Sequence, residues 1–197
     1  MMTTLRTLPM VTLGALVLSW LASGRTACAD GVVLALSPDD QQEITARLGG
    51  GVVGQAVASQ PITDPSVYFP LREKALTYQV TAGSNAGKTQ ILRLARSTRP
   101  NGNPAWRFQL SPTLAAFIRT APNGDLVIPA VSDTDHGVVV VTTPANPFLP
   151  KGMNPGDARP FSQTVAINYL DDPTTQDYSG TLTGTYTYVG TYQVPVP

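Results

Sequence analysis

The segment Tyr178–Val194, with the sequence YSGTLTGTYTYVGTYQV, decides the fold class. Its even-numbered positions carry tyrosine, glycine, leucine or valine, whereas most of its odd-numbered positions carry threonine. A period of two places these sets on opposite faces of a β-strand, and a helix would mix them. Its 17 residues would extend roughly 55 Å at about 3.3 Å per residue, well beyond an ordinary strand. Glycines at 180, 184 and 190 on the tyrosine face favour a sheet that coils over a core or a cavity.

Shorter segments with the same period precede this one. We expect strands at 75–80, 89–95, 106–110, 115–119, 126–131, 138–143 and 161–169. Turn signals separate them, such as Asn123-Gly124. The segment 144–160 contains five prolines and is predicted to be mostly irregular. The sequence therefore predicts a mainly β protein, an antiparallel meander that forms a coiled sheet or half-barrel, with one short N-terminal helix.

The end of the chain continues the alternation. Pro195 and Pro197 have no N–H to donate, so this segment can pair only at an edge. We therefore expect the final strand, residues 191–197, to lie at an open edge of the sheet and to leave the core incompletely covered.

One helix is predicted near the N-terminus. Ser37 can cap it, Pro38 suits the first helical position, and Asp40 completes a variant of the capping box. Ile44 and Leu48 fall on one face, and glycines 49–51 end the helix. The following residues, 52–65, are small and polar with two prolines and are predicted to form a surface linker.

The first 29 residues have the features of a secretory signal peptide. Arg6 supplies a basic start, Met10–Ala22 is an uncharged, mostly apolar run, and Ala27-Cys28-Ala29 supplies a cleavage site. The alternative is a lipoprotein signal acylated at Cys28, but the apolar residue expected three positions before such a cysteine is missing. We expect an exported chain, periplasmic or extracellular, with a signal peptide at 1–29, a helix and linker at 30–66, and a β domain at 67–197. The predicted mature chain has no cysteine, so it contains no disulfide.

Composition excludes several kinds of site. The net charge of zero, with charged residues at 13%, argues against a nucleic-acid partner. The hydrophobic run in the predicted signal is too short to span a bilayer, so the protein is not expected to span the membrane. Residues 74–124 nevertheless hold seven bases and no acid. This basic block indicates either an anionic ligand or surface, or pairing with acidic strands across the sheet.

An acidic turn is the candidate metal site. Asp133 and Asp135 alternate before His136-Gly137, as carboxylates do in calcium loops, although the later glutamate of a helix-loop-helix site is missing. The alternative is an ordinary turn, because aspartate bonds to its own backbone there. His136 is the sole histidine, so any Ser-His-Asp triad must use it, and there is no G-x-S-x-G motif. No cofactor is expected.

Five short segments resemble motifs of a widespread group of exported bacterial β proteins of unknown function. The group opens with P-L-x-x-G-x-x-W-x-Y, to which Tyr68-Phe69-Pro70-Leu71 and Leu76-Thr77-Tyr78 are similar, with Leu76 in place of the tryptophan. Its second Pro-rich stretch is similar to Pro147–Pro150 followed by Asn154–Asp157, and its V-x-V-P-A-G strand end to Val194–Pro197. The resemblance, over about Tyr68–Pro197, implies a half-barrel similar to lipoprotein carriers, in an envelope protein able to hold an apolar ligand.

Three functions follow as hypotheses. The first is a non-enzymatic envelope protein that binds an apolar or lipid-like ligand on the inner face of the curved sheet, against Tyr186, Tyr188 and Tyr192. The second is a structural or protein-interaction module that pairs through a sheet edge, for instance with an envelope protein. The third is a hydrolase of unknown class that uses His136 or a carboxylate.

Overall fold

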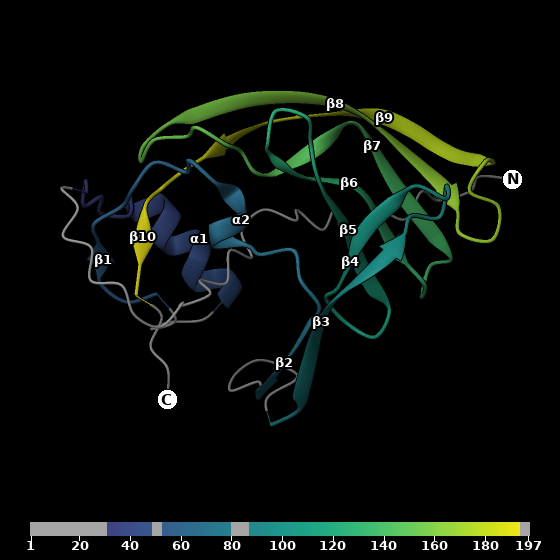
Figure 1. Cartoon of the computed structure of the whole chain (residues 1–197), viewed down its shortest axis with the longest axis horizontal. Helices are drawn as coiled ribbons and strands as arrows, with labels where there is room; N and C mark the ends of the chain where they lie inside the picture. The colour runs from purple at the N-terminus through teal and green to yellow at the C-terminus, as the bar shows by residue number, and fades with distance from the viewer. Residues whose placement is uncertain (1–30, 49–52, 80–86, 194–197) are drawn as a thin grey trace, which may run out of the picture.

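The computed structural model describes residues 31–48, 53–79 and 87–193. Eight strands form one antiparallel sheet in which each strand lies beside its neighbours in the sequence. In order they are β2 (Lys74–Gln79), β3 (Thr89–Thr98), β4 (Pro104–Gln109), β5 (Leu114–Thr120), β6 (Leu126–Asp133), β7 (Val138–Leu149), β8 (Ala158–Tyr169) and β9 (Gln176–Thr187). The sheet is strongly curved, and β2 and β9 form its open ends (Figure 1). The predicted mainly β meander is confirmed.

The alternation along the strands builds the main core on one face of the sheet. Its buried members on the strands include Leu92, Leu94, Phe108, Ile118 and Ile128. Phe69, which lies beyond the sheet, packs edge-on against Phe108 at 5.5 Å and against Phe148 at 5.0 Å between ring centroids. A smaller cluster occupies the opposite face and contains Ala105, Phe117, Ala130 and Val139.

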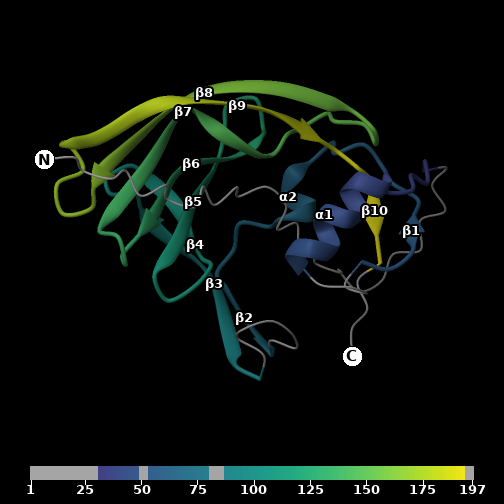
Figure 2. The ribbon, with the colours of Figure 1, turned by 180° about the vertical axis from the view of Figure 1, so that it is seen from behind.

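The remaining elements form a second group at one end of the sheet (Figures 1 and 2). We call this group the helical layer; it consists of α1 (Pro38–Leu48), β1 (Ala56–Val57), α2 (Pro65–Tyr68) and β10 (Thr191–Tyr192). The predicted cap of α1 is confirmed, since the Asp40 N–H donates to Ser37 Oγ at 3.1 Å and Ser37 Oγ donates to Asp40 Oδ2 at 2.6 Å. Neither α1 nor α2 is long and apolar enough to cross a membrane.

The structure differs from the predicted linker at 52–65. Ser59 is 2% exposed and Ile62 is 4% exposed, so this segment contributes to the interior. The Ile62 N–H donates to the Met153 carbonyl at 2.9 Å, and Ser59 pairs with Val32 through main-chain bonds. These partners are distant in the sequence, so local composition did not indicate the burial.

The prediction of one continuous strand at 178–194 is wrong. Strand β9 ends at Thr187, and β10 leaves the large sheet to pair with β1. Gly190 has φ of +120°, a conformation outside the β region that glycine adopts without strain. The prediction that the final strand extends the edge of the sheet is therefore wrong for Thr191 and Tyr192. Its remaining part, residues 194–197, lies outside the described residues.

The prediction of irregular structure at 144–160 is wrong for its first residues and for its last three, Ala158–Pro160, which begin β8. Strand β7 continues to Leu149 through Pro144 and Pro147. The pairing of β6 with β7 shifts register between Ile128 and Ala130, and again between Leu126 and Val127. Such irregularities tolerate prolines because they interrupt the regular ladder of hydrogen bonds.

Candidate binding site

The three tyrosines predicted to bind a ligand all lie where the sheet meets the helical layer. We call Tyr186, Tyr188 and Tyr192 the tyrosine row. The Tyr186 hydroxyl donates to the Phe148 carbonyl at 2.6 Å, and the Tyr188 hydroxyl donates to the Gln60 carbonyl at 3.1 Å. The Tyr192 hydroxyl lies 2.8 Å from the Leu34 carbonyl oxygen and 2.9 Å from that of Val189. Through these hydrogen bonds, the tyrosine row connects the C-terminal strands to main-chain segments that are distant in the sequence.

Burial of the Tyr186 side chain favours the protonated form of its hydroxyl. It raises the pKa of this hydroxyl to about 12, so the hydroxyl stays protonated and remains a hydrogen-bond donor to the Phe148 carbonyl. The Tyr186 and Tyr188 rings pack against the main core. The inner face of the sheet at these two residues is thus occupied by the protein's own side chains.

A cavity of about 270 Å³ lies beside the third tyrosine. Tyr192 contributes to its wall, together with residues of α1, of β1 and of the segments that flank them. The apolar part of the lining comes from Ala35, Leu36, Ile44, Val53 and Ala56, and the polar part includes Gln41 and Thr45. Ligand pockets typically measure about 300–1,000 Å³, so this cavity lies just below the usual range and has a mixed apolar and polar lining. The sequence pattern identified Tyr192 but not the helix that completes the cavity.

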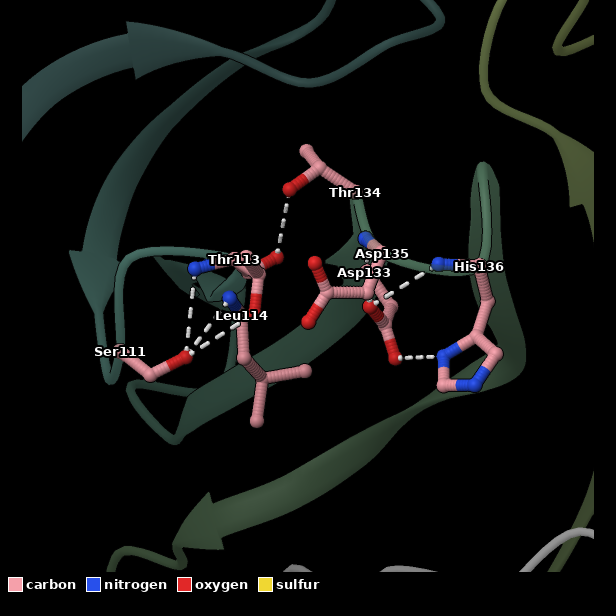
Figure 3. A network of polar contacts seen from close by, with 7 residues as sticks. All are labelled: Ser111, Thr113, Leu114, Asp133, Thr134, Asp135 and His136. Carbon is pink, nitrogen blue, oxygen red and sulfur yellow. Dashed lines mark hydrogen bonds and ion pairs between the residues drawn. The ribbon is translucent and has the colours of Figure 1, made fainter.

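The acidic turn between β6 and β7 forms a compact hydrogen-bonded unit (Figure 3). Asp133 Oδ2 lies 2.7 Å from His136 Nδ1, and Asp133 Oδ1 accepts from the Asp135 N–H at 3.0 Å. Partial burial raises the pKa of Asp133, but the hydrogen bonds from His136 and Asp135 outweigh it, so this pKa lies below its ordinary value. The Asp133 carboxylate is therefore already engaged within its own turn.

This geometry gives little support to metal binding or hydrolysis at the turn. Within 31–48, 53–79 and 87–193, no three His, Cys, Asp or Glu residues group closely enough to hold a metal ion. Ser111, the serine drawn nearby, lies on the far side of Asp133 from His136, and its Oγ accepts from the Leu114 N–H at 3.0 Å (Figure 3). Metal binding by Asp133 and Asp135 stays a prediction.

Two arginines of the basic block, Arg93 and Arg107, do not pair with acidic residues on the neighbouring strands. Arg93 has Ala75 and Gln109 as its cross-strand partners. Arg107 lies opposite Ala95 and Phe117. Neither arginine therefore has a carboxylate directly across the ladder.

Comparisons with known proteins give one partial similarity. No family model matches the chain, and no solved structure matches it. Curated proteins from three strains of Xanthomonas campestris pv. campestris (B100, 8004 and ATCC 33913), each described as a potassium-transporting ATPase KdpC subunit, are 34% identical over 98 residues. The match covers 49% of this chain and 46% of each relative. The chain thus spans about half the length of the curated relatives it matches.

Proposed function

We propose that this chain is an exported, non-catalytic envelope module that assembles through strand β9 at the edge of its sheet. The observation that supports the proposal is the composition of this edge. Strand β9 has 12 residues with neither proline nor lysine, and Asp177 is its sole charged residue. Among the described residues, its one neighbour in the sheet is β8. Proteins usually protect open edges with proline, lysine, bulges or short strands. Strand β9 is long and has neither proline nor lysine, and its one register shift against β8 lies at its start, beside Asp177.

The partner that fits this edge is a second copy of the chain. Two β9 strands can pair antiparallel about a two-fold axis, which is the commonest symmetry of homo-oligomers. The exposed face of β9 carries Thr181, Thr183 and Thr185. Threonine pairs across strands are favourable, and such pairing would bring no like charges together in this central part. The similarity to proteins described as subunits of an ATPase agrees with a protein that acts in an assembly.

The test is the association state of the purified full chain over a wide range of concentrations, measured by analytical ultracentrifugation. We expect the wild type to associate reversibly and Thr181→Lys with Thr183→Lys to remain monomeric, because paired lysines repel across the two-fold axis. Thr143→Lys, at an exposed position of the interior strand β7, is the matched control and should associate normally. A wild type that stays monomeric at every concentration would refute assembly through β9.

The cavity beside Tyr192 supports a second candidate, the binding of a small apolar ligand. The lining of this cavity of about 270 Å³ includes Leu36, Ile44 and Tyr192. A neutral fluorescent naphthylamine probe should bind the wild type, and Ile44→Trp should abolish binding by filling the cavity. Val67→Trp, at a position that is 71% exposed, is the control and should bind like the wild type. Equal binding by both variants would rule out this cavity as the site.

A further inference from the structure

A groove of about 300 Å³ lies on strands β3 and β4, far from β9 in the order of the sheet. Its lining, which we call the arginine groove, consists of Arg93, Ala95, Arg96, Ser97, Arg107 and Gln109. Arg93 and Ala95 alternate with the buried Leu92 and Leu94, so they face away from the main core. Arg107 likewise precedes the buried Phe108. The Arg93 and Arg107 side chains therefore belong to the outer face of the sheet, whereas Arg96 alternates with them and lies on the inner face beside Trp106.

The strand register explains why this face is hollow. Arg107 lies directly opposite Ala95, whose methyl group fills little space. Arg93 lies opposite Gln109, and the Gln109 side-chain amide donates to the main chain of the next turn, to the Ser111 and Leu114 carbonyls. The long side chains of Arg93 and Arg107 thus lie beside the small Ala95 side chain and beside the Gln109 amide, which is already hydrogen-bonded to the main chain.

The positive charge of the groove has no partner within the part of the chain that the structure describes. Arg93 and Arg107 form no ion pair or hydrogen bond there through their guanidinium groups, and Arg96 lies over the Trp106 ring with 5.3 Å from its Cζ to the ring centroid. The sequence from 74 to 124 contains no acid. Like charges on neighbouring strands are destabilising, so Arg93 and Arg107 without counter-charges have a cost in stability.

A second pair of arginines extends this positive region. Burial, and then the neighbouring charge of Arg119, lowers the pKa of Arg99, which follows the end of β3. Arg99 Nε is buried without a hydrogen-bond partner among the described residues. A cluster of positive charges at the surface raises the local concentration of anions.

We propose that the arginine groove binds a phosphate group. Guanidinium groups present paired N–H donors that match the oxygens of phosphate, and such charge-assisted bonds are among the strongest in proteins. A phosphate monoester carries about −1.5 to −2 charges at pH 7, which offsets most of the charge that Arg93 and Arg107 bring together. The phosphate can belong to a free solute or to a phospholipid headgroup. This inference does not depend on assembly through β9, which uses other residues.

The test measures phosphate binding by the full chain with two probes. Isothermal titration with inorganic phosphate reports a free anion, and co-sedimentation with vesicles of phosphatidylcholine with or without phosphatidylglycerol reports a headgroup. Arg107→Gln should weaken binding about tenfold or more, because hydrogen bonds to charged groups contribute about 1.5–3 kcal/mol each. Arg72→Gln removes the same charge from an exposed position outside the groove and should leave binding near that of the wild type.

Each outcome decides the proposal. Titration with phosphate that is sensitive to Arg107→Gln supports a soluble ligand, and vesicle binding with the same sensitivity but without phosphate titration supports a headgroup. Failure of both probes, or equal weakening by Arg72→Gln and Arg107→Gln, overturns it. Thermal unfolding of Arg107→Gln separates misfolding from loss of binding, because removal of a like charge should leave the melting temperature equal to or above that of the wild type.

Discussion

Gly184 in β9 has no side chain, and this absence leaves space for an aromatic ring of the neighbouring strand. It lies opposite Phe161 of β8, and a Cβ atom at this position would come within 2.7 Å of Phe161 Cζ. We expect Gly184→Ala to lower the free energy of unfolding by about 1–3 kcal/mol, since the ring must move from its place. Urea unfolding of the full chain measures the change.

Gly180→Ala is the matched control for this substitution. The added Cβ there would meet Tyr178 at 3.2 Å, but Tyr178 is 61% exposed and can move into solvent. Its effect on the free energy of unfolding should be smaller than that of Gly184→Ala. Equal losses at the two positions would mean that the contact with Phe161 has no special role.

Tyr186 gives the protein a predictable response to alkaline pH. Burial raises the pKa of its hydroxyl from 10 to about 12, so the unfolded chain loses this proton at lower pH than the folded chain does. The contribution of Tyr186 to stability is complete below pH 10 and is lost as pH rises toward 12. The free energy of unfolding of the wild type should therefore fall more steeply across this window than that of Tyr186→Phe.

At neutral pH the same substitution removes the hydrogen bond to the Phe148 carbonyl. We expect a loss of about 1–3 kcal/mol, because the carbonyl is left unpaired at a buried position. Tyr178→Phe, at an exposed ring, should change neither the stability nor its pH dependence. Parallel pH profiles for the wild type and Tyr186→Phe would show that the Tyr186 hydroxyl is accessible to water.

At the scale of elements, alternation predicted the strands well and their ends poorly. The segment 75–80 became β2 (Lys74–Gln79), and the first part of 178–194 became β9, because half-buried and exposed positions alternate there. The segments 126–131 and 115–119 became β6 and β5, although several successive positions of each are buried. Gly190 was misread because glycine serves both as a small residue on a packed face and as a residue with positive φ, and the sequence does not distinguish the two. Pro144 and Pro147 were misread because the register shifts that admit them depend on β6.

The cap of α1 is the local signal that the sequence predicted most completely. Ser37→Ala removes the acceptor of the Asp40 N–H, and such changes cost about 1 kcal/mol. We expect faster amide hydrogen exchange within α1, with exchange in β5 and β6 unchanged. Ser162→Ala, at an exposed position of β8, is the control. If the exchange rate of α1 in Ser37→Ala equals that of the wild type, the cap does not limit the opening of the helix.

At the scale of the whole molecule, the candidate sites depend on contacts between distant segments. The alternation of the sequence was enough to place the even-numbered tyrosines on the inner face of the sheet. It did not predict that their hydroxyl groups bond to the carbonyls of Leu34, Gln60 and Phe148. The basic block was visible in the sequence, whereas the cross-strand neighbours of Arg93 and Arg107 became clear only from the register of β3 with β4. The sequence thus predicted that the tyrosines share one face and that the bases cluster. The contacts of these residues depend on the pairing of segments that are distant in the sequence.

The same long-range contacts predict that the helical layer opens before the large sheet does. Its two-stranded sheet pairs only Ala56 with Tyr192 and Val57 with Thr191, whereas the large sheet buries Ile118 and Leu126 almost completely. Regions with few buried contacts open at a lower free energy than the core. The Tyr192 hydroxyl connects this layer to Leu34, so Tyr192→Phe should increase hydrogen exchange in α1 and β1 while β5 and β6 keep their protection. Tyr169→Phe removes an exposed tyrosine bond to Asp177 instead and should leave exchange in α1 unchanged. An equal increase across both sheets in Tyr192→Phe would show that the layer and the large sheet unfold as one unit.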